Sequence, residues 1–284
     1  MPTRLTSTLL ILLICLSVAA RGEEWRKAYS SSGKPDIRVE TNDAEIHVNT
    51  ADRNDVEVVV TTDRYKIGSG GVNISERQSG NRVDIEVHVP SMHHFINISG
   101  RSRSVRIQLN VPRQADLNLH SGDGTITAQD LAGNAILRSG DGNIEVSNTT
   151  GNLEIETGDG RIDCRHVEGD LIAETHDGDV RVDGTFSKLE LRTGDGSIDA
   201  VIGRGSKMNS VWSLRSGDGS ITLALPDGFA ADLDAHTGDG QIRVDFPVTV
   251  QGSLRGNEMR GKINGGGQNL EIRSGDGNIT LRHS

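Results

Sequence analysis

The stretch SGDGNIEV at residues 139–146 is followed by TGDGRIDC at residues 157–164. The phrase Ser/Thr-Gly-Asp-Gly that opens both stretches occurs seven times between residues 121 and 277, and a degenerate copy reads THDG at residues 175–178. A fixed short period indicates one structural unit stacked on itself. The seven copies begin at Ser121, Ser139, Thr157, Thr193, Ser216, Thr237 and Ser274.

The spacing of the aspartates defines the length of the repeat. The first five, Asp123, Asp141, Asp159, Asp177 and Asp195, follow one another at intervals of 18 residues. The later intervals, measured to Asp218, Asp239 and Asp276, are 23, 21 and 37 residues. We therefore expect residues 203–211 and 247–267 to form loops or an irregular half-rung.

Apolar and polar side chains alternate between successive copies. Ile144 and Val146 follow one phrase, and Leu153 and Ile155 precede the next. Every second residue is apolar, as in a strand with one buried face. Each repeat therefore supplies one strand before the Gly-Asp-Gly corner and one after it. A further apolar residue in the link, such as Leu131, indicates a third and shorter side.

These strands predict an all-β fold, a single-stranded parallel β-helix (β-solenoid) with rungs of about 18 residues and Gly-Asp-Gly corners. Like strands of consecutive rungs run in one direction and are expected about 4.8 Å apart. Parallel crossovers are almost always right-handed, so we expect a right-handed coil. A left-handed hexapeptide helix has rungs of similar length, but its regular apolar spacing on three equal sides is not found in this sequence.

We interpret the repeated phrase as turn chemistry rather than as an active site. Glycine permits positive φ in a sharp turn, aspartate can bond nearby backbone amides, and the Ser/Thr column can form a ladder of hydroxyls. The degenerate copy has His176 in place of a glycine, and histidine is among the residues that tolerate positive φ. The structural corner residues assigned on this basis are Gly122, Asp123, Gly124, Gly140, Asp141, Gly142, Gly158, Asp159, Gly160, Asp177, Gly178, Gly194, Asp195, Gly196, Gly217, Asp218, Gly219, Gly238, Asp239, Gly240, Gly275, Asp276 and Gly277.

Four segments are expected along the chain. A signal peptide occupies residues 1–20, a short linker 21–34, an irregular β region that caps the solenoid 35–115, and a regular parallel solenoid 116–284. The N-terminal region contains alternating strands, but its corner at Asp43 lacks the flanking glycines. A solenoid needs an atypical end to cover its open edge, and this region is suited to that role.

The first twenty residues have the pattern of a secretory signal. Arg4 forms the basic region, residues 9–18 are apolar, and small residues precede the expected cleavage site at Ala20. A lipoprotein anchor at Cys15 is the less favoured alternative, because Ile14 stands where a small residue is needed. We therefore expect an exported protein, periplasmic, at the cell surface or extracellular, without a transmembrane span after cleavage.

Charge and cysteine content exclude several classes. The 284-residue chain has 30 Lys and Arg against 40 Asp and Glu, a net charge of −10, which argues against nucleic-acid binding. Cleavage after residue 20 removes Arg4 and leaves 29 − 40 = −11. Cys164 is then the remaining cysteine, so no internal disulfide is expected. It aligns with Val146 and Val182 and is predicted to be core rather than a nucleophile.

The repeated Gly-Asp-Gly-x-Ile corner, the strands that end in Val-Pro at residues 89–90 and 111–112, and the run GGGQNLEIRSGDGNI at 265–279 resemble one known family. It is a bacterial β-strand-repeat family labelled "putative adhesin", of unknown function, and the similarity covers roughly residues 35–284. The resemblance implies a right-handed parallel β-helix in a secreted or envelope protein. It supplies no catalytic residue to carry over.

An enzyme is not expected, and neither catalytic residues nor a cofactor are assigned. A glycosidase needs two carboxylates across a cleft, one with a raised pKa. The corner aspartates instead form a line of equivalent groups, and the sequence shows no long loops that would build a cleft. Two tryptophans and two tyrosines give no aromatic platform for sugars.

Metal binding is also a minor alternative. Ca²⁺ takes six to eight oxygens, and one aspartate per rung supplies few of them. His93 and His94 lie beside a basic cluster of Arg101, Arg103 and Arg106, but the sequence identifies no third ligand. No metal residue is assigned. A solvated mixed-charge face is the better interpretation of one outward column, which contains His120, Arg138, Glu156, Glu174, Arg192, Arg215, His236 and Arg273.

The sequence thus favours a non-catalytic, adhesin-like protein of the cell envelope or secreted space. Its long polar columns suit repeated weak contacts with an unidentified protein or polysaccharide. A self-associating structural protein is the alternative, because an uncapped solenoid end can pair with another strand edge.

Overall fold

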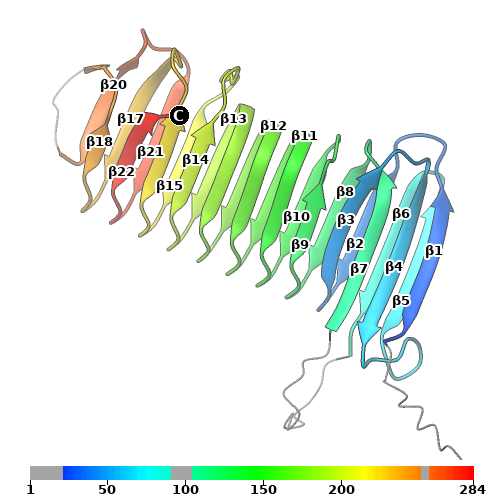
Figure 1. The fold of residues 1–284 in the computed structure, drawn as a ribbon. Helices are drawn as coiled ribbons and strands as arrows, with labels where there is room; N and C mark the ends of the chain where they lie inside the picture. Colours follow the sequence, from blue (N-terminus) through cyan, green and yellow to red (C-terminus); the bar gives the residue numbers. More distant parts are fainter. Residues whose placement is uncertain (1–21, 91–103, 251–255) are drawn as a thin grey trace, which may run out of the picture.

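The computed structural model describes residues 22–90, 104–250 and 256–284, so the expected signal peptide lies outside it. In this part of the chain the fold is all β, with 22 strands and no helix. The strands belong to one continuous hydrogen-bonded system that is not closed into a barrel. Figure 1 shows them stacked side by side in an elongated row, with β1 and β5 near one end and β18 and β20 near the other.

Each rung consists of a strand, a sharp corner and a second strand. The strands before the corner form the pre-corner face, where like positions of neighbouring rungs pair in parallel register: Leu137 lies opposite Leu119 on one side and Ile155 on the other. In spatial order this face contains β6 (Arg82–His88), β2 (Asp36–Thr41), β8 (Asp116–Ser121), β10 (Ala135–Ser139), the C-terminal parts of β11 (Ile144–Thr157), β12 (Ile162–Thr175) and β13 (Val180–Thr193), then β15 (Trp212–Ser216), β21 (Asn269–Ser274) and β17 (Ala231–Thr237).

The strands after the corner form the post-corner face, which is also parallel. Ile144 lies opposite Ile126 and Ile162. In spatial order this face contains β7 (Ser104–Pro112), β3 (Glu45–Ala51), β9 (Ile126–Gln129), the N-terminal parts of β11, β12 and β13, then β14 (Ile198–Ile202), β16 (Ile221–Leu225), β22 (Ile279–His283) and β18 (Ile242–Val244).

A short third side connects one rung to the next. β11, β12 and β13 continue through it, and Thr150 pairs with Glu168 in parallel across neighbouring links. Asn148 and His166 adopt φ of 52° where the post-corner strand bends into the link. The bend lets one long strand belong to two faces.

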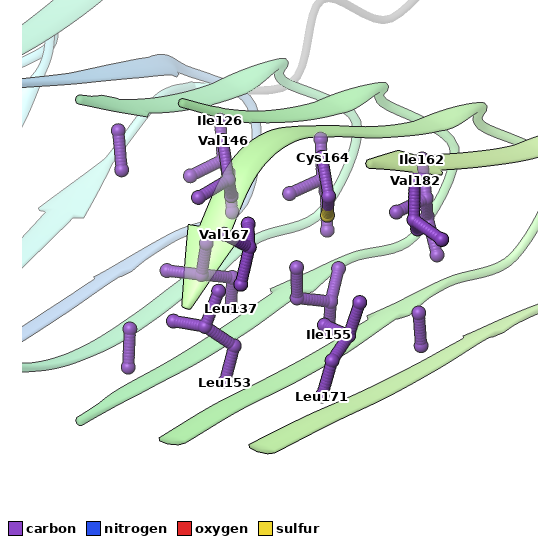
Figure 2. Close-up of a cluster of buried hydrophobic side chains, with 14 of the residues drawn as sticks. Ile126, Leu137, Val146, Leu153, Ile155, Ile162, Cys164, Val167, Leu171 and Val182 are labelled. Carbon is purple, nitrogen blue, oxygen red and sulfur yellow. The ribbon is translucent and has the colours of Figure 1, made fainter. Parts of the chain in front are cut away.

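Inward side chains of the two faces meet in a continuous apolar core (Figure 2). On the post-corner face, Cys164 lies in register between Val146 and Val182 and is fully buried. This confirms its predicted place in the core. Leu153 and Leu171 fill the corresponding column on the pre-corner face. Aliphatic columns of this kind stabilise each rung through its neighbours.

The spatial order of rungs differs from the chain order at both ends. The β2–β3 rung lies between β6–β7 and β8–β9. The β21–β22 rung lies between β15–β16 and β17–β18. The last regular repeat of the sequence is therefore an internal rung, although it comes last along the chain.

Antiparallel strands pair with both faces at the N-terminal end of the stack and with the pre-corner face at the other end. β1 (Glu24–Ser30) pairs with β4 (Asp55–Asp63), which pairs with β7, and β5 (Asn73–Ser79) pairs with β6. At the other end, β20 (Glu258–Ile263) pairs with β17, and β19 (Val248–Val250) pairs with β20. Residues 116–284 were expected to be regularly parallel and depart from this at β19 and β20, which bond a rung edge that would otherwise be open.

The segment 21–34, expected as a linker, contains β1. Trp25, Lys27 and Tyr29 share one face of this strand, so a lysine interrupts the apolar alternation that would have revealed it. The Lys27 amine pairs with the carboxylate of Glu76 on β5, and the Tyr29 hydroxyl donates to Glu76 Oε2 at 2.8 Å. Side chains of β1 and β5 thus meet over the N-terminal end of the core.

Candidate functional site

Close packing between rungs, rather than a left-handed backbone, explains the corner glycines. No corner glycine of the described residues has a positive φ. A Cβ on Gly142 would lie 2.2 Å from the carbonyl oxygen of Gly124 in the preceding rung, and a Cβ on Gly140 would lie 2.4 Å from that of Gly122. The expectation of positive φ at these glycines, and at His176, is therefore wrong.

The corner hydroxyls bond the backbone of two rungs at once. The Ser139 hydroxyl accepts a hydrogen bond from Gly142 N–H at 3.0 Å and donates to the Gly124 carbonyl at 3.0 Å. The expected hydroxyl-to-hydroxyl ladder is not formed in the described chain. The same double contact recurs in six other corners, at Ser121, Thr175, Thr193, Ser216, Thr237 and Ser274.

The corner aspartates form an exposed column along one edge of the solenoid. Their backbones join the stack, as when Asp141 N–H donates to Gly122 O at 3.1 Å. Within the described residues their carboxylates make no hydrogen bond, so the Asx turn inferred from the sequence is absent. Partial desolvation at its corner, with a smaller contribution from Asp123, raises the pKa of Asp43 although its side chain is exposed. In spatial order the column contains Asp43, Asp123, Asp141, Asp159, Asp177, Asp195, Asp218, Asp276 and Asp239.

No three His, Cys, Asp or Glu side chains among residues 22–90, 104–250 and 256–284 are grouped so that they could hold a metal ion. His93 and His94, with Arg101 and Arg103, lie outside these ranges. Arg106, the third basic residue of that cluster, instead donates from Nη2 to Glu45 Oε2 at 2.9 Å.

The outward column of the pre-corner face is a mixed-charge surface, as expected. Arg138 Nε lies 3.1 Å from Glu156, and Arg192 Nε lies 3.7 Å from Glu174. Hydrogen bonds from Arg273 are the main cause that lowers the pKa of Asp234. His120 and His236 take register positions opposite arginines of neighbouring rungs. Exposed pairs of this kind contribute about 0–1 kcal/mol each.

The post-corner face carries a different feature, a polar hollow of about 310 Å³. It extends over β3, β9, β11 and β12, and its walls combine amides, hydroxyls, an imidazole and three charged groups. The lining residues are His47, Asn49, Thr127, Ala128, Gln129, Glu145, Val146, Ser147, Asp163 and Arg165.

An amide row leads into the hollow from its N-terminal side. Gln129 donates to Asn49 Oδ1 at 3.3 Å, Asn49 donates to Asn110 Oδ1 at 3.5 Å, and Asn110 donates to Glu57 Oε2 at 2.9 Å. The bond from Asn110 is the main cause that lowers the pKa of Glu57. Each amide side chain is therefore held by its neighbour before any ligand binds.

Charged and titratable groups complete the hollow. His47 Nδ1 lies 2.8 Å from the Thr127 hydroxyl, and its Nε2 lies 3.3 Å from Glu45 Oε2. Arg165 binds both carboxylate oxygens of Asp163, at 2.9 and 2.6 Å, which raises the pKa of Arg165. The hollow thus offers fixed donors and acceptors rather than a strong net charge.

Sequence reasoning missed this site because its walls are distant in sequence. The pair Gln129–Asn49 and the pair His47–Thr127 are each separated by 80 residues. They meet because the β2–β3 rung lies beside β8–β9. The alternation in β3 indicated that its polar side chains point outward, but nothing in the sequence indicated which rung would lie beside them.

Cys164 has no role at this site. Its side chain points into the core, and burial raises the pKa of its thiol.

Within the described residues the structure contains no helix with the length and apolarity needed to cross a bilayer.

Comparison with known proteins gives a family and several solved structures. The family model described as Toastrack DUF4097 matches residues 35–282. No curated protein matches the sequence.

Three of the solved structures found by the comparison are similar to this chain at low sequence identity. A "putative lipid binding protein" from Parabacteroides distasonis is 15% identical with a TM-score of 0.47, covering 93% of this chain and 97% of its own. A "putative adhesin" from Bacteroides fragilis is 10% identical with a TM-score of 0.36, covering 91% and 97%. A "putative cell adhesion protein" from Clostridium sporogenes is 13% identical with a TM-score of 0.33, covering 93% and 100%.

Proposed function

This chain belongs to the Toastrack DUF4097 family, and we propose that it is a non-catalytic β-solenoid that binds a hydroxyl-rich polymer at the bacterial cell surface. The proposal includes a right-handed coil and export through the N-terminal signal. The polymer is a polysaccharide or another chain with regularly spaced hydroxyl groups.

The polar hollow with its amide row is the observation that carries the proposal. Asn110, Asn49 and Gln129 stand on three adjacent strands and are held in a relay of hydrogen bonds. Neighbouring strands repeat at about 4.8 Å. A ligand with its own short repeat can therefore meet similar groups on successive rungs, and pre-ordered side chains lose little freedom on binding.

The chemistry of the hollow favours binding over catalysis. Glu145 and Asp163 are register neighbours on β11 and β12, so both carboxylates lie on one wall. Hydrolysis of a glycoside needs carboxylates on two sides of the bond to be broken. Amides, hydroxyls and the paired Asp163–Arg165 supply donors and acceptors that match sugar hydroxyls.

The test is co-sedimentation of the protein with insoluble peptidoglycan and, as a second polymer, with an uncharged glucan. The variant Asn49→Ala/Gln129→Ala should lose binding, because it removes two members of the amide row. Asn118→Ala is the matched control, since Asn118 is an amide on β8 of the pre-corner face. Equal binding by wild type, hollow variant and control would contradict the proposed site.

Self-association through an open solenoid end is the weaker alternative. It rests on an uncapped solenoid end that can pair with another strand edge, but the pre-corner edge at the C-terminal end of the stack is bonded by β20, and β19 pairs with β20. Sedimentation over a range of concentrations tests the alternative directly. Cell fractionation of the full chain tests export.

A further inference from the structure

The rung formed by β21 and β22 lies between two rungs that precede it in the sequence. Its strands hydrogen-bond to β15 and β16 on one side and to β17 and β18 on the other. Its apolar side chains Leu270, Ile272, Ile279 and Leu281 are fully buried. The chain passes from β16 directly to β17 and thereby leaves a slot one rung wide, which β21–β22 fills.

A glycine-rich connection joins this rung to β20. It reads NGGGQ at residues 264–268, and Asn264, Gly265 and Gly266 have φ of 46°, 91° and 89°. Side chains other than glycine rarely adopt such angles, so this turn depends on its glycines. A turn of this kind is also the place where the chain can open with little steric resistance.

The rung that fills the slot is similar in sequence to the rung beside it. LRSGDGSITL at residues 214–223 lies in register beside IRSGDGNITL at residues 272–281. The corner glycines pack closely, since a Cβ on Gly275 would lie 2.3 Å from Gly217 O. A segment that enters the slot must therefore carry a Gly-Asp-Gly corner flanked by alternating aliphatic residues.

From these contacts we infer that the β21–β22 rung exchanges between copies of this chain: the NGGGQ turn opens and the rung of one molecule fills the slot of another. The partner is a second copy, because its rung matches the slot in register, corner geometry and buried side chains. Exchange of an identical element makes the same contacts as the closed form and changes mainly the hinge. This contact differs from end-to-end pairing of solenoids.

A pair of single-cysteine variants detects the exchange. Thr222 and Thr280 are register partners on β16 and β22, and paired residues about 4.8 Å apart lie within disulfide range. One preparation carries Thr222→Cys and the other Thr280→Cys, both in a Cys15→Ser background, while Cys164 stays buried. Neither chain alone contains both partners, so the two thiols become register neighbours only in an exchanged dimer.

The two preparations are mixed, unfolded, refolded together over a range of concentrations and oxidised, and the products are separated without reductant. We expect a disulfide-linked dimer whose yield rises with protein concentration. The control mixture pairs Thr222→Cys with Thr127→Cys, a half-buried outward position on the same face whose register partners lie on β3 and β11, and the dimer should be lost.

A positive control keeps the outcome decisive. The double variant Thr222→Cys/Thr280→Cys should form its disulfide within one chain at low concentration, which shows that the geometry permits the bond. If it does so while the mixture yields no more dimer than the Thr127→Cys control at any concentration, the inference is overturned. Deleting Gly265 and Gly266 should raise the dimer fraction, because the shortened turn opposes closure.

Discussion

Every copy of the Ser/Thr-Gly-Asp-Gly phrase ends in glycine, whereas its second position is His176 in one copy. Alanine substitutions at Gly140 and Gly142, the two glycines of one corner, test the reason for this difference. Gly142→Ala would place a methyl group 2.2 Å from Gly124 O and 2.7 Å from the Ser139 hydroxyl oxygen. Gly140→Ala would place one 2.4 Å from Gly122 O, at a position that His176 occupies in another rung. Both alanines must displace backbone, but only the first also disturbs the hydroxyl.

The magnitudes follow from these contacts. Overpacking costs about 1–3 kcal/mol, and a weakened hydrogen bond between Gly142 N–H and the Ser139 hydroxyl adds about 1 kcal/mol. We therefore expect Gly142→Ala to lower the free energy of unfolding by about 3 kcal/mol. Gly140→Ala should cost about 1 kcal/mol, since the related His176 is accommodated.

Thermal and urea unfolding monitored by far-ultraviolet circular dichroism measure both effects. About 2–4 °C per kcal/mol applies to a chain of this size, so Tm should fall by about 10 °C for Gly142→Ala and about 3 °C for Gly140→Ala. Gly151→Ala serves as a comparison in which φ of 139° adds backbone strain. A Gly142→Ala variant as stable as the wild type would refute the close-packing explanation, and equal losses for the Gly142 and Gly140 variants would refute the added contribution of the Ser139 hydroxyl.

Three further predictions concern buried and paired groups. Ser139→Ala should lower the free energy of unfolding, measured in urea, by about 2 kcal/mol, because it leaves two buried backbone groups unpaired. Thr149→Val is the control and should lower it by nothing, because the Thr149 hydroxyl has no hydrogen-bond partner in the described chain. Equal losses for the two variants would contradict the prediction. Cys164 should react with a thiol reagent only as fast as the protein unfolds, so rapid labelling in native buffer would show that it is not core. Arg273 lowers the pKa of Asp234, so this carboxylate stabilises the fold above its unfolded pKa of about 3.9 and loses that contribution as the pH falls through its lower folded pKa. The stability deficit of Arg273→Gln at pH 6 should therefore shrink steadily as the pH falls below about 3.9. A deficit independent of pH would exclude this pair as its cause.

The regular rungs were predictable because each signal is local. Alternation places Ile144 and Val146 in the core, and the same argument places Cys164 beside them. The corner phrase correctly marked where the chain turns. Its chemistry was misread, because the contact between Gly142 and Gly124 crosses rungs and becomes visible only when the rungs are stacked.

The candidate site could not be predicted for a different reason. The strands of every rung have similar apolar alternation, so the pattern does not reveal which rungs become neighbours at the ends of the stack. Asn49 and Gln129 are brought together by the insertion of β2–β3 beside β8–β9. Strand β1 was expected to be part of a linker, because Lys27 interrupts its apolar alternation and the partner of Lys27, Glu76, lies on a strand distant in sequence.

The internal position of the β21–β22 rung also determines how the molecule responds to mechanical load. In a solenoid built in chain order, tension at residue 284 would peel the outermost rung first. Here the same tension acts on strands bonded on both sides, so the hydrogen bonds to two neighbouring rungs must break before the rung leaves. Forced unfolding is governed by the unfolding rate rather than by equilibrium stability. A tether attached at this end would therefore pull against the interior of the stack.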